Sequence, residues 1–155
     1  MDSKKLDQTD IGILNLLQQD AYITLKELAY ELKRNKSVIG ERIHYLQNSG
    51  YIKAAVALID IKKIRNIFTA FPLIQLANHN EETFVAFQQL VSEHREVMEC
   101  HHVMGQYDFL LKIVVSDAQE YNIFLRRYIS TLPYVVRVES FPMLAEIKKE
   151  TCYAL

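Results

Sequence analysis

Apolar residues along the first third of the chain recur at helical intervals and predict short amphipathic helices. The first such stretch covers about residues 9–19. Its apolar positions begin at Ile11, after Asp7 and Thr9, whose side chains can cap a helix. Thr24 and Glu27 have the spacing of a capping box, in which each side chain accepts a hydrogen bond from a backbone N–H that the helix leaves free. We therefore expect a second helix directly after Thr24.

A third helix is predicted over about residues 36–48, with Asn35 as its N-cap and Gly50 at the position where helices often end. Because successive residues are rotated by about 100°, one side of this helix is apolar and consists of Ile39, Ile43 and Leu46. The opposite side is polar and consists of Ser37, Gly40, Glu41, His44 and Asn48. Short helices joined by tight turns indicate a helix-turn-helix.

The segment after these helices marks a change of structure. Residues 51–60 are apolar and rich in β-branched side chains and predict a short strand, whereas residues 61–65 resemble a charged connector. We place the domain boundary here. Residues 1–65 then form a helix-turn-helix domain with its connector, and residues 66–155 form a second domain.

The second domain alternates between strand-like and helix-like patterns. Strands are predicted over residues 68–76, 97–103, 109–115 and 135–141, and helices over about residues 81–94 and 118–131. This order is that of a ferredoxin-like βαββαβ domain, with two helices on one face of an antiparallel sheet, so the chain is of the α+β class. Nothing in the sequence covers the other sheet face, and we expect at least a dimer.

Pro72 is unfavourable inside a central strand, because it lacks the N–H that the ladder needs. We therefore expect a bulge or a late strand start near Phe71.

Composition indicates a folded protein. Half of the 155 residues are apolar, and Gly and Pro are scarce. The net charge is −1, but residues 1–65 hold 11 Lys and Arg against 8 Asp and Glu, whereas residues 66–155 hold 7 against 11. A basic first domain permits contact with nucleic acid. The polar N-terminus and the lack of a long apolar run predict a cytoplasmic protein without a membrane partner.

Few residues are suited to metal or enzyme chemistry. Cys100, His101 and His102 are adjacent, but in a strand His101 faces away from the other two, and no further His or Cys is spaced to complete a metal site. Cys100 and Cys152 are expected to be free thiols. No Ser with a paired His and Asp indicates a nucleophile. We expect no catalytic residue, no metal and no cofactor.

The polar side of the third helix has two interpretations: a solvated face, or a surface that enters the major groove of double-stranded DNA. The basic cluster at the start of this helix favours the second, because Lys and Arg bind the phosphates that position a reading helix. The candidate DNA-binding residues are Lys33, Arg34, Asn35, Lys36, Ser37, Gly40, Glu41, Arg42, His44 and Tyr45. Arg42 and Tyr45 lie at the flank, where each either holds a phosphate or ties the helix to its neighbours.

A second candidate site lies in the predicted hairpin connection at residues 104–108. The carboxylate of Asp108, beside Tyr107 and Gly105, can bind an ammonium group while backbone N–H groups bind a carboxylate. The other interpretation is that Asp108 only caps the turn.

The chain resembles the Lrp/AsnC family of bacterial and archaeal regulators, also called feast/famine proteins. In the first half the resemblance rests on Leu6-Asp7-x-x-Asp10-x-x-Ile13-Leu14-x-x-Leu17-Gln18-x-Asp20-Ala21, on Glu27-Leu28-Ala29 and on Arg42-Ile43-x-x-Leu46-x-x-x-Gly50-x-Ile52. In the second half it rests on Gly105-x-Tyr107-Asp108-Phe109-Leu110-Leu111 and Leu132-Pro133-x-Val135. The motifs stand in the family's order and span nearly the whole chain.

This resemblance implies a sequence-specific, DNA-binding transcriptional regulator. It implies a winged or extended helix-turn-helix, then a ferredoxin-like sensing domain called the RAM domain, in homodimers that often assemble into octamers. It implies no catalysis, and an amino acid as the usual effector, bound between neighbouring dimers and changing oligomeric state or DNA affinity. The effector-binding candidates are then Gly105, Gln106, Tyr107, Asp108 and Ser140.

Two features of the first domain depart from the family pattern. The turn before the third helix reads Lys33-Arg34-Asn35 where the family usually has Gly-Leu-Ser, and Tyr45 stands where Arg is frequent. An alternative function is an amino-acid-binding regulatory subunit of an enzyme, with the helical domain docking onto protein. A further alternative is an enzyme that uses the Cys100-His101-His102 cluster.

Overall fold

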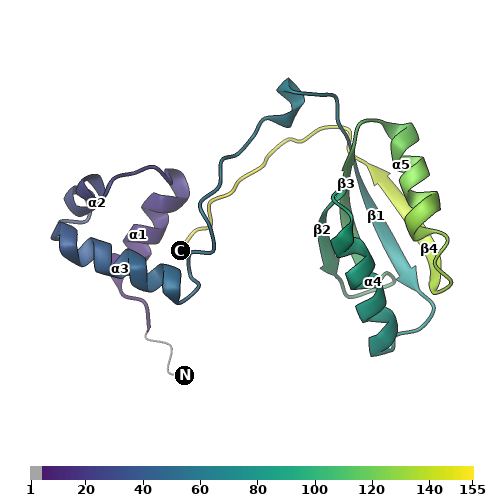
Figure 1. The fold of residues 1–155 in the computed structure, drawn as a ribbon, viewed down its shortest axis with the longest axis horizontal. Helices are drawn as coiled ribbons and strands as arrows, with labels where there is room; N and C mark the ends of the chain where they lie inside the picture. The colour runs from purple at the N-terminus through teal and green to yellow at the C-terminus, as the bar shows by residue number, and fades with distance from the viewer. Residues whose placement is uncertain (1–4) are drawn as a thin grey trace. The chain divides into compact units, whose positions relative to one another are not determined.

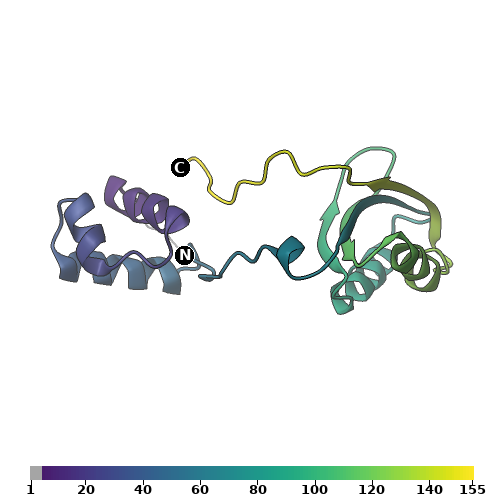
Figure 2. The ribbon, with the colours of Figure 1, turned by 90° about the horizontal axis from the view of Figure 1, so that it is seen from above.

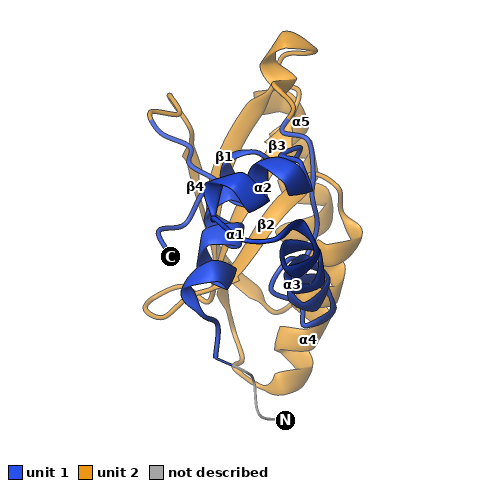
Figure 3. Cartoon of the chain, turned by 90° about the vertical axis from the view of Figure 1, so that its left-hand side faces the viewer, with its two compact units in different colours: residues 1–58, 148–155 blue, residues 59–147 orange. Residues whose placement is uncertain are grey.

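The chain is divided into two compact units. The computed structural model describes residues 5–155, and residues 1–4, which belong to the domain predicted over residues 1–65, lie outside the described residues. One unit comprises the chain up to Leu58 together with Lys148–Leu155, and the other comprises Ile59–Ile147 (Figure 3). The predicted boundary after Arg65 thus falls just inside the second unit.

The last residues of the chain return to the helical unit and are held there by one residue, Gln18. The Gln18 side-chain amide donates to the Tyr153 carbonyl at 3.2 Å and accepts from the Tyr153 N–H at 2.7 Å. The Cys152 thiol donates to the Gln18 carbonyl at 3.1 Å. This C-terminal segment therefore packs on the first helix rather than on the sheet.

The helical unit contains three helices (Figure 1): α1 (Gln8–Gln19), α2 (Leu25–Glu31) and α3 (Lys36–Asn48). Asp7 is the N-cap of α1, and the capping box predicted for Thr24 and Glu27 at the start of α2 is confirmed. One buried residue of α1, one of α2 and two of α3 form the core, namely Ile13, Leu28, Ile39 and Leu46. The three predicted helices are thus present and share one apolar centre.

The ends of α3 agree with the prediction only in part. Gly50 follows the helix with φ of 76°, a left-handed conformation that glycine adopts without strain. Asn35 occupies the N-cap position, but its side chain makes no capping hydrogen bond, so the predicted capping by Asn35 was wrong. The strand predicted within residues 51–60 is also absent. A strand needs a neighbour for its backbone groups, and the described residues of this unit contain no other strand.

The second unit confirms the predicted βαββαβ order. Its elements are β1 (Phe68–Leu76), α4 (Glu81–Glu93), β2 (Val97–His102), β3 (Phe109–Val115), α5 (Ala118–Phe124) and β4 (Val135–Pro142). The sheet order is β2-β3-β1-β4 with every pair antiparallel. Figure 2 shows α4 and α5 on the same face of the sheet, as in a ferredoxin-like fold.

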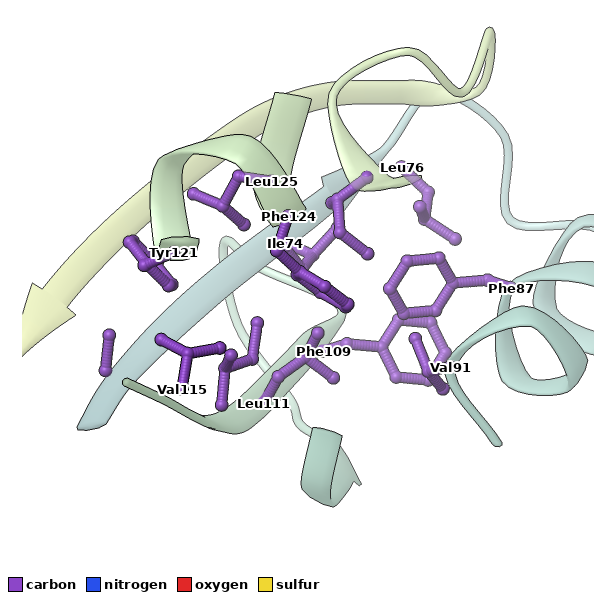
Figure 4. Packing of buried hydrophobic residues seen from close by; sticks show 13 residues of the cluster. Ile74, Leu76, Phe87, Val91, Phe109, Leu111, Val115, Tyr121, Phe124 and Leu125 are labelled. Carbon is purple, nitrogen blue, oxygen red and sulfur yellow. The ribbon is translucent and has the colours of Figure 1, made fainter. Parts of the chain in front are cut away.

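The core of this unit lies between the two helices and one face of the sheet (Figure 4). Alternate residues of β1 and β3 point into it, and α4 and α5 contribute aromatic side chains. Phe87 of α4 lies 4.7 Å, centroid to centroid, from Phe109 of β3, and both are almost completely buried. Figure 4 shows Tyr121, Phe124 and Leu125 over the other end of the same core.

Two local features differ from the prediction. The helix predicted over residues 118–131 changes at its middle into a π-helical turn, η2 (Leu125–Ile129), with a hydrogen bond from the Ser130 N–H to the Leu125 carbonyl. This wider turn leaves Ile129 fully buried. Pro72 sits inside β1 opposite Ser140, and the register shift falls at Gln75/Leu76 instead of near Phe71.

The other face of the sheet carries no helix of its own unit. Its middle is apolar and consists of four half-buried residues and one exposed residue, namely Phe71, Leu73, Leu110 and Val114, and Phe141. We call this set the open sheet face. Charged pairs border it on both sides, Lys112 with Glu99 at 2.8 Å and Arg137 with Glu139 at 3.1 Å.

Candidate nucleic-acid interface and effector site

The outer side of α3 is exposed, as the sequence pattern predicts. Ser37, Glu41, His44 and Asn48 are exposed along the helix, and Gly40 is half-buried between them. The His44 Nε2 and the Asn48 side-chain amide lie 3.0 Å apart. At the start of the helix, Lys33, Arg34 and Lys36 are exposed and make no ion pair within residues 5–155. The surface therefore combines free cations with polar side chains.

The unusual turn keeps a helix-turn-helix geometry despite its sequence. Lys33 has φ of 51°, the left-handed conformation for which the family uses glycine. Its N–H donates to the Tyr30 carbonyl at 3.2 Å, and the Arg34 N–H donates to the Ala29 carbonyl at 3.0 Å. Arg34 points outward, and a shallow hollow remains beside it, lined by Ala29, Tyr30, Glu31, Lys33, Arg34, Asn35 and Val38. Helix α2 thus ends in a turn in which the backbone of Lys33 is strained.

Replacing Lys33 with glycine should stabilise the helical unit. The left-handed conformation costs a residue with a Cβ about 1 kcal/mol, whereas glycine adopts it without that cost. Lys33→Ala is the matched control, because it removes the same charge and keeps the Cβ. Chemical denaturation should give Lys33→Gly a free energy of unfolding about 1 kcal/mol above that of Lys33→Ala. Equal stability of the two variants would show that the turn is not strained.

Arg42 ties α3 to the start of α1. Its Nη1 lies 2.7 Å from the Asp7 carboxylate and 2.8 Å from Asp10 Oδ1. The Asp10 carboxylate is buried and also accepts from the Asp7 N–H, so Asp7 and Asp10 cap α1 reciprocally. Of the two roles considered for Arg42, holding a phosphate or tying α3 to its neighbours, these ion pairs correspond to the second. It fixes the angle at which α3 presents its outer side.

The pKa of Asp7 provides a test of this network. The hydrogen bond from Arg42 lowers the pKa of Asp7 from 3.8 to about 2, with backbone N–H groups acting in the same direction. Because the folded-state pKa is the lower one, the resulting stabilisation is complete above about pH 4 and is lost as the pH falls towards 2. Acid titration of the helical unit by circular dichroism should show this loss. Arg42→Gln should weaken it, and an unchanged acid profile in that variant would contradict the assignment.

Tyr45 lies on the flank of α3, half-buried against the core of the helical unit. Its ring centroid is 6.4 Å from that of Tyr51. This packing helps to fix the position of the segment that follows α3.

The hairpin between β2 and β3 brings most of the effector candidates together. Gly105 is exposed with φ of 132°, and Gln106 is exposed beside it. Asp108 is buried, and its Oδ2 accepts from the Leu76 N–H at 2.7 Å. Its Oδ1 lies 3.0 Å from Nε2 of the exposed His79. Asp108 therefore does cap the end of β1, while its second oxygen faces a side chain at the surface.

Tyr107 and Ser140 point to opposite faces of the sheet. The Tyr107 hydroxyl donates to the Glu139 carboxylate, which raises the pKa of Tyr107, and the Arg137 guanidinium lies 5.5 Å from the Tyr107 ring centre. Ser140 instead accepts from the Tyr121 hydroxyl at 2.6 Å, next to α5. The structure thus does not bring Ser140 to the hairpin.

Tyr107 contacts Glu139 and Arg137. Neither of these two residues was among the candidates named from the sequence. The alternation along β4 places them on the open sheet face, but only the tertiary fold shows that Tyr107 reaches across to them.

The cysteine and histidine cluster is divided as expected. Cys100 and His102 face the α4 side, where His102 packs 4.9 Å from the Phe84 ring, and His101 faces Glu99 at 3.1 Å. Cys100 and Cys152 are free thiols. Within residues 5–155 no group of three metal-ligating side chains is close enough to hold a metal ion, and no helix is long and apolar enough to cross a membrane.

A helix-turn-helix unit followed by a ferredoxin-like domain defines a class of two-part regulators, and comparisons with known proteins agree. The model of the Lrp/AsnC ligand-binding domain matches residues 69–152, and that of a winged helix-turn-helix DNA-binding domain matches residues 6–53. The chain is similar to the DNA-binding transcriptional activator DecR of Escherichia coli, with 33% identity over 94% of this chain and 96% of that protein. It is also similar to the glutamate uptake regulatory protein of Zymomonas mobilis, with 34% identity over 98% and 92%.

Solved structures show the same architecture. An AsnC family transcriptional regulator from Agrobacterium tumefaciens has a TM-score of 0.88 at 32% identity, covering 96% of this chain and 97% of its own. A transcriptional regulator from Neisseria meningitidis, solved as a complex with L-Met, has a TM-score of 0.89 at 25% identity, with 97% of both chains covered. The chain belongs to the Lrp/AsnC family of DNA-binding transcriptional regulators, and most of its second unit lies within the match to the family's ligand-binding domain.

Proposed function

We propose that the protein is a homodimeric regulator, assembling further towards an octamer, whose oligomeric state or DNA affinity responds to an amino acid. The observation that carries the proposal is the open sheet face. In this small unit α4 and α5 cover only one side of the sheet, and an apolar surface of that kind favours association with an identical surface through a two-fold axis.

The outer side of α3 is the proposed DNA-reading surface. Lys33, Arg34 and Lys36 hold phosphates, and the polar side chains of α3 approach base edges in the major groove. Arg42 and Tyr45 act on this surface by holding α3 in place. In the dimer, two such helices enter successive major grooves about one helical turn apart.

The hairpin at residues 104–108 is the proposed effector site. The exposed backbone around Gly105 and Gln106 offers N–H donors for an α-carboxylate, and the Asp108 oxygen that faces His79 is suited to an ammonium group. The Neisseria meningitidis regulator that is similar in fold was solved as a complex with L-Met, which supports an amino acid as the effector class. Ser140 is the weakest candidate, because its hydroxyl is bonded to Tyr121 on the other face.

An effector that binds one assembly more tightly than another shifts the balance between them, and DNA affinity changes by the same linkage. The alternative function, a regulatory subunit whose helical unit docks onto an enzyme, predicts no affinity for duplex DNA. Salt dependence separates the two, because each phosphate contact contributes about −0.9 to the slope of log affinity against log salt concentration.

The test is binding of the purified full chain to the DNA upstream of its own gene across a salt series, alone and with pooled amino acids. We expect saturable binding that weakens steeply with salt and changes with one pool, together with a shift in sedimentation. Identical DNA affinity and identical sedimentation with every pool would contradict the proposed response to an amino acid. The absence of any duplex binding would favour the docking alternative.

A further inference from the structure

The exposed side of α3 carries one hydrogen-bond acceptor and one side chain that can donate. Glu41 offers a carboxylate and His44 offers an imidazole, three residues apart on the same side of the helix. Since an α-helix rises about 1.5 Å per residue, the two lie about 4.5 Å apart along the axis. Successive base pairs are stacked about 3.4 Å apart, so two such side chains are spaced to reach adjacent base pairs.

Asn48 fixes which atom of His44 carries the proton. The Asn48 Nδ2 lies 3.0 Å from the His44 Nε2, and an amide nitrogen can only donate. The Nε2 must therefore accept, which places the proton of the neutral ring on Nδ1. His44 then offers an N–H donor to a partner outside the chain. Asn48, one turn further along α3, holds the ring in this tautomer and orientation.

Glu41 is an unneutralised anion on a surface otherwise suited to DNA. Within residues 5–155 its carboxylate has no hydrogen bond and no ion pair. The neighbouring Arg42 cannot neutralise it, because its Nη1 is held by Asp7 and Asp10. Phosphates repel a carboxylate, and a hydrogen bond from a donor on a base edge offsets this repulsion. Cytosine offers its N4 amino group, whereas the amino group of adenine lies beside N7, an acceptor that repels a carboxylate.

We propose that Glu41 and His44 read two adjacent base pairs, Glu41 accepting from the N4 amino group of a cytosine and His44 donating from Nδ1 to the acceptor edge of a guanine, with Asn48 as the positioning residue for His44. Guanine fits this donor because O6 and N7 are both acceptors. The proposal rests on the proposed function, in which α3 enters the major groove, and adds the base identities that the helix selects.

The test is selection by the full chain from a pool of DNA duplexes with a randomised core, followed by affinity measurements on the enriched sequences and their single-base variants. We expect wild-type selection to enrich a cytosine and a guanine at neighbouring base pairs. Glu41→Gln should change the preferred base at the first position from cytosine to adenine, because glutamine pairs with adenine N6 and N7. The ratio of the two affinities should change about tenfold, and overall affinity should rise because repulsion by the phosphates is removed.

Glu93→Gln on α4 is the matched control, because it removes the same exposed charge from the other unit. It should leave the base preferences unchanged. Asn48→Ala should weaken discrimination at the guanine position alone, since His44 is then free to change tautomer. Saturable binding with base preferences unaffected by Glu41→Gln and Asn48→Ala would overturn this proposal only. No enrichment from the pool by the wild-type chain would overturn both this proposal and the DNA-reading role of α3.

Discussion

Phe87→Ala should lower the free energy of unfolding of the sheet unit by about 3–5 kcal/mol, since removal of a fully buried aromatic side chain leaves a cavity that a packed core closes only in part. Phe87 lies against Phe109 at 4.7 Å, and Phe109 in turn contacts Phe84 at 5.6 Å, so the loss falls where α4 meets the sheet. Urea denaturation monitored by circular dichroism measures it.

Val85→Ala is the matched control, because Val85 lies on the same helix and is 52% exposed. It should change the free energy of unfolding by less than about 0.5 kcal/mol. A small loss in Phe87→Ala, comparable to that in Val85→Ala, would mean that α4 does not pack on the sheet as described.

Leu110→Lys should dissociate the proposed dimer. Leu110 lies in the open sheet face, paired with Leu73 of β1, and a two-fold interface would place two lysines in apolar surroundings without partners. Burying an unpaired charge costs several kcal/mol, so the dimer dissociation constant should rise by about 100-fold or more. Sedimentation velocity over a range of protein concentrations measures the change.

The control for this variant is Ile123→Lys, which adds the same charge at an exposed position of α5, on the helix-covered side of the sheet, and should leave the dimer intact. Leu110 is only half-buried in the single chain, so the lysine can extend into solvent and the unit should remain folded. Wild-type assembly by a folded Leu110→Lys protein would exclude the open sheet face as the dimer interface.

The sequence predicted those features that depend on residues close together in the chain. The strand over residues 68–76 and the helix over residues 36–48 were predicted with the bounds found in the structure, because apolar periodicity is a local property. The capping box at Thr24 and Glu27 was also predicted, since its two partners are three residues apart. The candidate DNA-reading residues followed in the same way from the rotation of a helix.

Contacts between distant residues could not be predicted in this way. Arg42 and Asp10 are 32 residues apart, as are Tyr107 and Glu139, and no sequence spacing indicates either pair. Asn35 shows the converse: it has the residue type of a cap and occupies the cap position, yet its side chain makes no capping bond. The strand predicted within residues 51–60 failed because a strand depends on a neighbour that its own sequence does not contain.

The sequence by itself determined the three helices of the first unit, the βαββαβ order of the second and the resemblance to the family, because secondary structure follows from local periodicity and the family motifs are short. Only the tertiary structure decided that Asp108 caps β1 while facing His79, that Ser140 points to α5, and that the Asn48 amide lies against Nε2 of His44. These properties depend on directions of side chains from different elements, or from successive turns of one helix. The folded chain sets such directions when it packs its two cores.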